Sequence, residues 1–181
     1  MPPTAESVPV PGGGATPDSH CPHCGGRFPE NAGWPRTCPR CGRVRYRNPL
    51  PVAVALQPVL LPTGGTALLA VRRAIEPRRG LLALPGGFID HGEDWRVAVV
   101  RELFEETRVR VEAERVRLFD ALGADGDHLL LFGLLPALAA ADLPPDLPTE
   151  ETEGRELLTG PRELAFPLHT RVARAWFAGH S

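Results

Sequence analysis

The sequence lacks lysine altogether and has almost no serine. The twenty residues counted as Lys or Arg are all arginine, and serine occurs only at positions 7, 19 and 181. Without lysine there is no P-loop lysine, no Schiff base and no lysine general base. The absence of serine between positions 19 and 181 argues against a Ser-His-Asp hydrolase. Carboxylates, histidines, four cysteines and bound metal ions are left to carry any chemistry.

Long hydrophobic runs are also missing. No apolar run approaches the ~18 residues that a transmembrane helix needs, and the N-terminus has no charged segment followed by an apolar one. The sequence therefore predicts neither a membrane span nor a secretory signal, and we expect a soluble, cytoplasmic protein. Its 181 residues suit one ordinary domain with a small appendage.

Acidic residues are absent from residues 31–75. This segment contains seven arginines and carries a charge of +7, so the rest of the chain carries −9 to give the net charge of −2. A basic part and an acidic part in one chain are typical of a protein that has an anionic ligand or an acidic metal site.

Composition divides the chain into three parts. Residues 1–19 hold five prolines and three consecutive glycines, so we expect a disordered tail. Residues 20–47 hold all four cysteines, and apolar runs begin after residue 48. In residues 48–181, short apolar runs between turn residues predict strands and helical periodicity predicts two helices, which indicates an α+β domain. We expect strands over 52–61, 66–71, 80–84, 110–121 and 128–135, helices over 94–107 and 168–177, a turn at 123–127, a loop at 136–150 and a helical turn at 162–165.

The four cysteines form two Cys-x-x-Cys-Gly pairs with thirteen residues between them. Two such pairs suit a closed tetrahedral zinc site, because each pair spans one edge of the tetrahedron. The glycine after each second cysteine permits positive φ, which turns backbone N–H groups toward the sulfurs. Two disulfides are the alternative, and a cytoplasmic setting favours zinc over them. We predict a structural zinc ion on Cys21, Cys24, Cys38 and Cys41.

Arginines surround these cysteines, at positions 36, 40, 43, 45 and 47. They offer contacts for nucleic-acid phosphate. A solvated basic surface is the alternative, and it is the interpretation that we favour.

The helix expected from its periodicity carries three glutamates. With 100° per residue, Glu102, Glu105 and Glu106 fall on the face opposite the apolar stripe. Carboxylates three and four positions apart repel one another on a helix, and a divalent cation reverses that interaction. A metal site and a solvated acidic face are the two interpretations. In the first, the small Ala98 leaves room for metal and ligand, and Arg101 is placed to orient Glu105 or Glu93.

The spacing of these residues follows a known pattern. Gly87, Glu93 and the run Arg101-Glu102-Leu103-Phe104-Glu105-Glu106 are spaced as G-x5-E-x7-R-E-U-x-E-E, where U is apolar. This pattern, closed by Val109, resembles the Nudix box, and the preceding Leu84-Pro85-Gly86-Gly87-Phe88 resembles the residues that lead into the box. Residues 48–181 are therefore similar to Nudix hydrolases. With a zinc ribbon over residues 20–47, the chain resembles zinc-ribbon Nudix proteins, which include relatives of NADH pyrophosphatase.

The resemblance implies a Nudix fold, in which a mixed β-sheet lies between helices and a metal site lies on a loop–helix–loop. It implies that Glu102, Glu105 and Glu106 bind Mg²⁺ or Mn²⁺, while Glu93 and Arg101 hold the loop and the helix together. It also implies a pyrophosphohydrolase that cleaves a nucleoside diphosphate linked to another moiety X, such as FAD, ADP-ribose or NAD(H). The products are a nucleoside monophosphate and X-phosphate. Enzymes of this type are frequently homodimers.

Residues outside the helix are candidates for substrate binding and proton transfer. Gly86 and Gly87 let the backbone approach phosphates closely, and Arg72 and Arg73 can reach a phosphate. The general base is either a box glutamate or a glutamate of a later loop, unless that loop is only a solvated acidic segment. The loop candidates are Glu150, Glu151, Glu153 and Glu156, of which Glu150 and Glu153 lie where many family members carry a glutamate.

The sequence departs from the family pattern at several points. The box glycine after Glu-Glu is Arg108, and a glycine there would end the helix in the left-handed conformation. The S-Q-P-W-P-F-P motif of NADH pyrophosphatases is absent, as is the downstream proline of many ADP-ribose pyrophosphatases. The substrate therefore stays open. A nucleoside triphosphate pyrophosphatase is one alternative, and a nucleotide-sensing or RNA-binding regulator is another; the retained box glutamates favour an enzyme.

Overall fold

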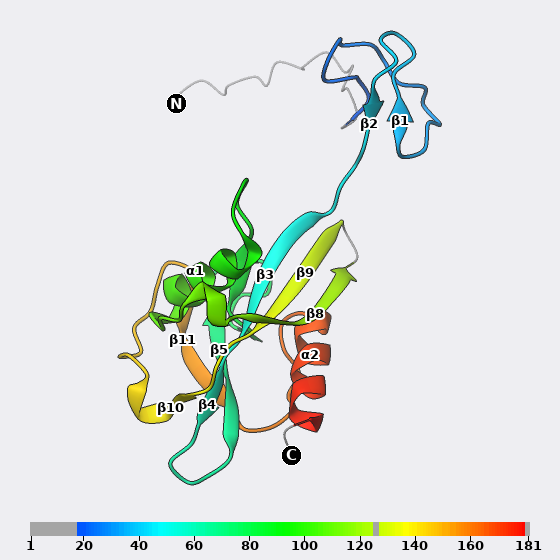
Figure 1. The fold of residues 1–181 in the computed structure, drawn as a ribbon. Coiled ribbons are helices and arrows are strands. Elements are labelled where there is room, and N and C mark those ends of the chain that lie inside the picture. The colour runs from blue at the N-terminus through cyan, green and yellow to red at the C-terminus, as the bar shows by residue number, and fades with distance from the viewer. Residues whose placement is uncertain (1–17, 125–126, 180–181) are drawn as a thin grey trace, which may run out of the picture. The chain divides into compact units, whose positions relative to one another are not determined.

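A computed structural model describes residues 18–124 and 127–179, which form two compact units (Figure 1). The first unit ends at Asn48 and the second begins at Pro49. The tail expected over residues 1–19 lies outside the described residues, apart from Asp18 and Ser19. None of the helices in the described ranges is long and apolar enough to cross a membrane.

The first unit contains a small antiparallel sheet of β1 (Arg36–Thr37) and β2 (Val44–Arg45). Its core consists of Cys21, Phe28 and Cys38, with Cys24 packed against them. A core of this size is too small to stabilise a short chain without a cross-link or a metal ion. The cysteines are therefore central to the folding of this unit.

The second unit consists of two sheets and two helices. The helices are α1 (Trp95–Thr107) and α2 (Pro167–Ala178), and short 3-10 turns cover Ala113–Arg115 and Ala140–Asp142. One sheet contains β3 (Leu50–Leu56), β7 (Gly86–Phe88), β8 (Arg117–Ala124) and β9 (His128–Leu134). The other contains β4 (Pro58–Leu60), β5 (Thr66–Arg73), β6 (Leu82–Ala83), β10 (Leu138–Ala139) and β11 (Thr152–Leu158).

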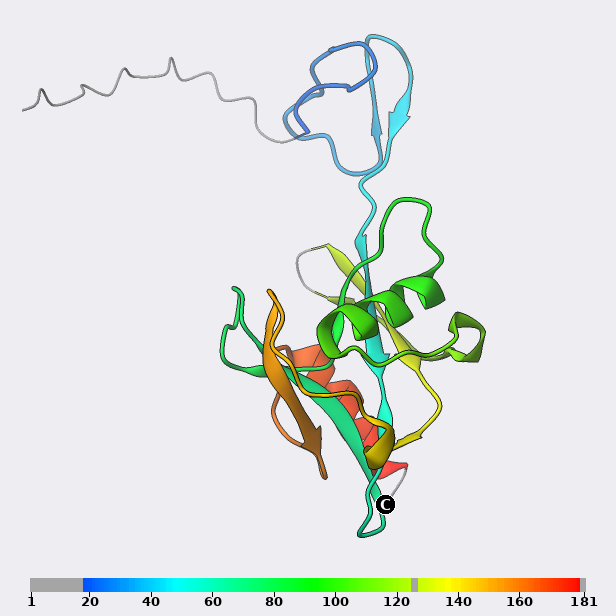
Figure 2. The ribbon, with the colours of Figure 1, turned by 90° about the vertical axis from the view of Figure 1, so that its left-hand side faces the viewer.

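Both sheets are mixed. The first has the strand order β7-β3-β9-β8, with β3 parallel to β9 and the other pairs antiparallel. The second has the order β10-β4-β5-β11, with β6 also paired to β5. Figures 1 and 2 show the sheets between α1 and α2. This is the α+β architecture that the resemblance implies.

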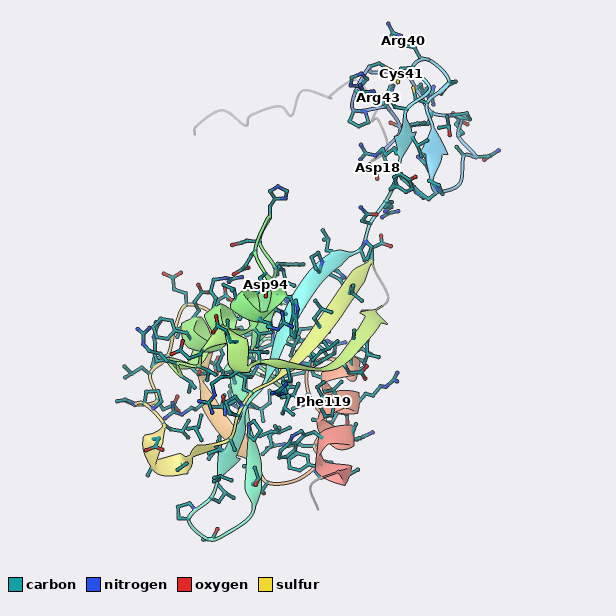
Figure 3. The ribbon with its side chains drawn as sticks, viewed as in Figure 1. Asp18, Arg40, Cys41, Arg43, Asp94 and Phe119 are labelled. Carbon is teal, nitrogen blue, oxygen red and sulfur yellow. The ribbon has the colours of Figure 1, made fainter. Side chains whose placement is uncertain are left out.

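Alternate residues of β5 supply two separate cores. Leu68 and Ala70 pack in the core that contains α2, whereas Leu69 and Val71 pack in the core that contains α1. Phe119 of β8 packs against the α2 core (Figure 3). β5 therefore contributes to the cores on both sides of the sheet, and its last two residues are Arg72 and Arg73.

The longest regular elements were predictable. The helices expected over 94–107 and 168–177 are confirmed, as are the strands expected over 66–71 and 128–135, each within two residues. The strand expected over 52–61 is divided at Gln57, where the chain passes from one sheet to the other. The buried Gln57 side chain donates to the carbonyl oxygens of Pro58 and Pro136 at 2.8 and 2.9 Å, which accounts for a polar residue at this point.

Other local expectations are wrong. No strand was expected directly after residues 80–84, but Gly86–Phe88 forms β7 against β3. The strand expected from residue 110 begins at Arg117 and continues through Gly123, where a turn was expected. The loop expected over 136–150 contains β10 and a 3-10 turn. β11 was not expected at all, because its composition is polar and it is defined by pairing with β5.

The helical turn expected at 162–165 is absent. The backbone N–H of Ala165 donates to the carbonyl of Leu82 at 2.7 Å, and that of Leu164 donates to the Thr170 hydroxyl at 2.9 Å. These N–H groups bind partners outside the segment, so they are not free to close a helical turn.

Candidate active site

Helix α1 is capped at both ends. The Asp94 side chain accepts from the backbone N–H of Arg96 at 2.8 Å. At the other end, Arg108 has φ 63° and its N–H donates to the carbonyl of Phe104 at 2.8 Å. A non-glycine residue in this conformation costs about 1–2 kcal/mol. The helix therefore ends in the left-handed geometry that the box glycine would give, even though the residue is arginine.

Two of the three helix glutamates are buried. Glu102 and Glu106 are 8% and 7% exposed, whereas Glu105 is exposed to solvent. The expectation that all three lie opposite the apolar face is wrong for this pair. The small Ala98 does not leave room for a ligand, because it is fully buried in the α1 core. The buried face of α1 contacts Gly86 and Gly87 of β7 as well as the apolar core, so it accommodates carboxylates too.

Burial raises the pKa of Glu106 to about 8, with a further contribution from the charge of Glu102. The Glu106 carboxylate accepts one backbone N–H, from Gly86 at 3.2 Å. Burial also raises the pKa of Glu102, although the Arg101 guanidinium opposes this shift. A cation between these carboxylates would oppose both shifts, because a nearby positive charge favours the ionised form.

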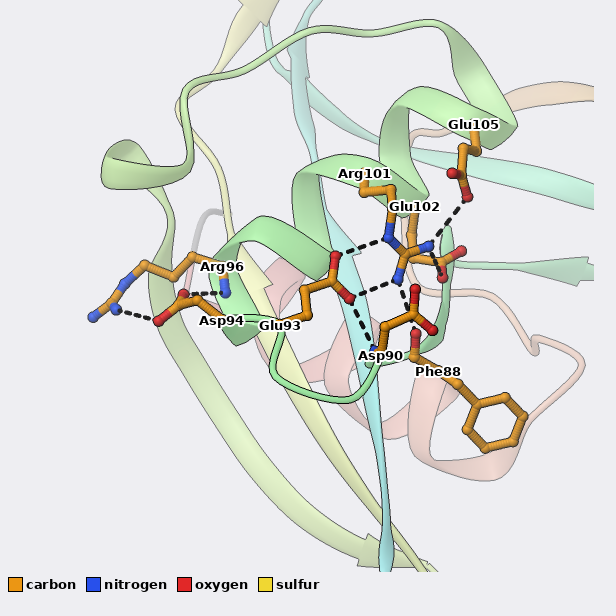
Figure 4. A network of polar contacts seen from close by, with 8 residues as sticks. All are labelled: Phe88, Asp90, Glu93, Asp94, Arg96, Arg101, Glu102 and Glu105. Atoms are coloured by element: carbon orange, nitrogen blue, oxygen red, sulfur yellow. Dashed lines mark hydrogen bonds and ion pairs between the residues drawn. The ribbon is translucent and has the colours of Figure 1, made fainter.

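Arg101 joins the loop before α1 to the helix (Figure 4). Its Nε and Nη2 donate to the two carboxylate oxygens of Glu93 at 2.8 and 2.9 Å, and Nη2 also donates to the carbonyl of Phe88 at 3.0 Å. Its Nη1 donates to Glu102 at 2.7 Å and to Glu105 at 3.2 Å. Hydrogen bonds from Arg101 lower the pKa of Glu93. One guanidinium thus orients two helix carboxylates and fixes the loop.

The two glycines before α1 are required by close contacts within the protein. A Cβ at Gly86 would lie 2.3 Å from the carbonyl oxygen of Ala53, and a Cβ at Gly87 would lie 2.5 Å from Oε1 of Glu102. Glycine at these positions therefore lets β7 pair with β3 and lets the Glu102 carboxylate approach the backbone.

The helix glutamates open into a cavity of about 540 Å³. Two residues of the later loop, Glu150 and Glu151, face them across it, and the charge of Glu151 contributes to the raised pKa of Glu106. The residues that line the cavity are Glu102, Glu105, Glu106, Arg108, Pro148, Thr149, Glu150 and Glu151. Five carboxylates around one cavity form a strongly acidic site.

Glu153 and Glu156, two other loop candidates, lie outside this cavity. At the start of β11 the Thr152 hydroxyl donates to the carbonyl of Glu106 at 3.3 Å, and the register shifts between Thr152 and Gly154. The intervening Glu153 is exposed. Glu156 is bound to two arginines, Arg72 and Arg162.

The two arginines at the end of β5 have different neighbours. Arg73 donates through Nε to the carbonyl of Pro77 at 2.8 Å, and its charge acts on both Glu106 and His169. Arg72 donates to the carbonyl of Gly80 at 2.7 Å and to Glu156 at 3.0 Å. Of these two arginines, only Arg73 has a charge that acts on a glutamate of the acidic cavity.

His169 was not anticipated from the sequence. It is buried at the start of α2, and its Nδ1 accepts from the backbone N–H of Leu84 at 3.2 Å. Burial, with a contribution from the Arg73 charge, lowers the pKa of His169 to about 3. It supports the chain just before Gly86 and Gly87. No sequence pattern signals this role, since the residues lie 85 positions apart.

The family model described as NUDIX domain matches residues 49–178. The chain belongs to the Nudix family.

Relatives of this Nudix chain include enzymes with different substrates. The chain is 31% identical over 126 residues to a protein of Edwardsiella ictaluri named NAD-capped RNA hydrolase NudC, covering 68% of this chain and 45% of that protein. It is 41% identical over 63 residues to the ADP-ribose pyrophosphatase of Methanocaldococcus jannaschii, covering 35% of this chain and 36% of that protein. The chain thus spans less than half the length of these curated relatives.

Solved structures share the Nudix fold. A NUDIX hydrolase from Nitrosomonas europaea has a TM-score of 0.61 and 25% identity, covering 88% of this chain and 90% of the other. The NUDIX domain of Shewanella oneidensis NrtR, solved in complex with ADP-ribose, has a TM-score of 0.51 and 20% identity, covering 63% of this chain and 75% of the other.

Outside the Nudix domain, the four cysteines are close together. Their Sγ atoms all lie within 4.8 Å of one another, with 3.8 Å between Cys21 and Cys41 and 3.6 Å between Cys24 and Cys38. Sulfur ligands about 2.3 Å from a tetrahedral zinc ion lie about 3.8 Å apart. The cluster therefore has the dimensions of a Cys₄ zinc site. Arg40 and Arg43 lie beside Cys41 (Figure 3).

Backbone N–H groups surround the sulfurs. Gly25 and Gly42 have φ of 69° and 71°, the positive values expected after each Cys-x-x-Cys pair. Hydrogen bonds from the backbone N–H groups of Cys24 and His23 lower the pKa of Cys21. At Cys21 this environment favours the thiolate, which is the form that binds metal.

Proposed function

We propose that this Nudix chain is a divalent-metal-dependent pyrophosphohydrolase that cleaves nucleoside diphosphates linked to another moiety. The products would be a nucleoside monophosphate and the phosphorylated moiety. The observation that carries this proposal is the single cavity in which Glu102, Glu105 and Glu106 face the loop glutamates Glu150 and Glu151. Carboxylates in this number suit the hard cations Mg²⁺ and Mn²⁺.

The residues present fit such a cation. Glu106 is buried with one backbone N–H as its hydrogen-bond donor, and burial, together with the charge of Glu102, raises its pKa to about 8. Glu102 is buried beside it, with its pKa also raised. We assign Mg²⁺ or Mn²⁺ to Glu102, Glu105 and Glu106. A bound cation would neutralise the pyrophosphate and lower the pKa of the attacking water.

The remaining residues have positioning and proton-transfer roles. Arg101 and Glu93 keep the loop fixed against α1, so that Glu102 and Glu105 hold their orientation. We assign the general base to Glu151, because it lines the cavity and its charge reaches both Glu102 and Glu106. Glu150 is the second candidate. Arg73 and the backbone at Gly86 and Gly87 are proposed to bind substrate phosphate.

The substrate class rests on the names of relatives as well as on the site. NAD-capped RNA and ADP-ribose, the substrates named for two relatives, both contain a pyrophosphate between a nucleoside and another group. Both are therefore proposed substrates. A nucleoside triphosphate pyrophosphatase would need the same carboxylates for its reaction. A nucleotide-binding regulator catalyses no reaction and would not need them.

A substrate screen separates these functions. The full chain is incubated with Mg²⁺ or Mn²⁺ and with ADP-ribose, NADH, FAD, diadenosine polyphosphates, NAD-capped RNA and nucleoside triphosphates. The proposal expects a nucleoside monophosphate and X-phosphate from at least one linked diphosphate. Release of inorganic pyrophosphate from triphosphates alone would identify the alternative enzyme. Tight nucleotide or RNA binding without turnover would support a regulator.

For the N-terminal region, we propose a zinc ribbon over residues 20–47 with Zn²⁺ on the four cysteines, followed by the Nudix domain over residues 48–181. The sulfur spacing supports this assignment. Such a closed site supplies folding energy and has no open position for catalysis.

A further inference from the structure

A second cavity lies on the α2 side of β5, and its lining is dominated by arginine. Its volume is about 630 Å³, which falls in the range of small-molecule sites. None of its lining residues lines the acidic cavity. The lining residues are Arg72, Arg78, Gly80, Leu81, Leu82, Arg162, Glu163, Leu164, Ala165, Pro167, Thr170, Arg171 and Arg174.

The arginines reach the cavity from three separate segments. Arg72 and Arg78 come from the end of β5 and the turn that follows it, and Arg162 comes from the segment after β11. Arg171 and Arg174 lie one turn apart on α2, whose first turn forms part of the wall. The N-terminal end of a helix adds partial positive charge. The convergence is therefore a product of the fold.

Acidic side chains neutralise only part of this charge. Glu156 binds both Arg72 and Arg162, and Glu163 is the one carboxylate in the lining. Within the described residues, the guanidinium groups of Arg78, Arg171 and Arg174 make no ion pair or hydrogen bond. Like charges gathered in one cavity repel one another, and an anion bound between them removes that repulsion.

The geometry points to a site for the linked phosphates of a small molecule, and we propose that this cavity binds a pyrophosphate group. Guanidinium groups bind phosphate oxygens through paired, charge-assisted hydrogen bonds. Several arginines around one cavity suit two linked phosphates better than one. The exposed Leu81 and the buried Leu82 and Leu164 offer an apolar surface beside them, which suits the base or sugar of a nucleotide. The proposal does not depend on the activity of the acidic cavity.

Binding of inorganic pyrophosphate to the full chain tests this site. Isothermal titration is carried out at low salt in metal-depleted buffer without added Mg²⁺ or Mn²⁺ and without a chelator, so that the acidic cavity has no cation to attract the ligand and the cysteine cluster keeps its metal. Arg171 and Arg174 are exposed on a helix, so R171A/R174A should fold. We expect this variant to weaken pyrophosphate binding about tenfold or more. Basal hydrolysis with Mg²⁺ should be unchanged.

Two further variants make the result specific. R115A/R117A removes two exposed arginines elsewhere and should leave binding within about twofold of the wild type. E156Q removes the carboxylate that holds Arg72 and Arg162, so pyrophosphate binding should tighten several-fold. ADP should bind at least as tightly as pyrophosphate, and orthophosphate more weakly.

Several outcomes would overturn the proposal. One is equal pyrophosphate binding by the wild type and R171A/R174A. Another is an equal loss in R115A/R117A, which would indicate a general charge effect. A third is tight binding of an RNA oligonucleotide without terminal phosphates that pyrophosphate does not displace. This result would assign the surface to nucleic acid instead. The binding measurements involve no turnover, so the binding proposal can fail while the proposed hydrolase activity stands.

Discussion

Arg101 donates two hydrogen bonds, of 2.8 and 2.9 Å, to the carboxylate of Glu93 in the loop that precedes α1. The same guanidinium reaches Glu102 and Glu105 with its remaining nitrogen. Three carboxylates therefore depend on one planar side chain for their orientation. Lysine cannot reproduce this pattern, because its ammonium group is a single point of contact.

R101K should lower kcat/KM by about 10- to 100-fold, the range seen when a residue that orients metal ligands is replaced. The loss should be accompanied by weaker Mn²⁺ binding, measured by titration calorimetry. R96K is the matched control, since Arg96 pairs with the exposed Asp94 at 3.9 Å and contacts none of the cavity glutamates through an ion pair in the described residues. Equal activity in R101K and the wild type would contradict this role.

E106Q and E105Q should each lower turnover by about 100-fold or more, because each removes a proposed metal ligand. The fold should be retained, since glutamine has nearly the same shape. Activity would be measured against the best substrate of the screen over a range of Mg²⁺ concentrations. E112Q, at an exposed position outside the cavity, is the control. Unchanged turnover in both cavity variants would refute the metal assignment.

E151Q should lower kcat by about 100-fold or more if Glu151 is the general base. E153Q is a close control, because Glu153 is exposed two positions along the chain and lies outside the cavity. The loss of kcat should occur in E151Q and not in E153Q. A large effect of E150Q with little effect of E151Q would transfer the role to Glu150.

His169 should make stability fall on acidification. Its pKa is lowered to about 3 in the folded protein, from about 6.5 in the unfolded chain. Below pH 6.5 the unfolded chain takes up a proton that the folded protein does not. The free energy of unfolding therefore falls by up to about 1.4 kcal/mol per pH unit from this group.

H169N is the variant that tests this linkage, because an amide oxygen can still accept from the Leu84 N–H. The groups around His169 are the charge of Arg73 and the rings of Phe132 and Phe166, which the variant leaves in place. Unfolding free energies would be measured at pH 7.5, 6 and 5. The slope against pH should be shallower in H169N, and identical slopes would show that His169 does not titrate as described.

The cysteine cluster should yield one zinc ion per chain by elemental analysis. A strong chelator should release it and loosen residues 20–47, measured by hydrogen exchange, while the Nudix domain keeps its protection. C41S should reduce the zinc content, whereas H23A should not, because His23 is not a member of the cluster. Protein purified without zinc, yet protected in this region, would contradict the zinc ribbon.

The helix and its carboxylates could be predicted because their information is local. The spacing of Glu93, Arg101, Glu102, Glu105 and Glu106 lies within one short segment, and a helical period is enough to place three of these residues near one another. The Cys-x-x-Cys-Gly pairs are local in the same way, and their positive-φ glycines were anticipated. These features require no knowledge of distant partners.

The neighbours of the site could not be predicted in this way. Burial of Glu102 and Glu106 depends on β7, where Gly86 donates to Glu106, and on other distant segments, and only the structure shows that Glu151 lines the cavity and Glu153 does not. Likewise, Arg72, Arg162 and Arg171 come together from three separate segments. Sequence periodicity predicts which face of a helix or strand a residue occupies. Packing and strand pairing between residues far apart in the chain determine which residues that face contacts.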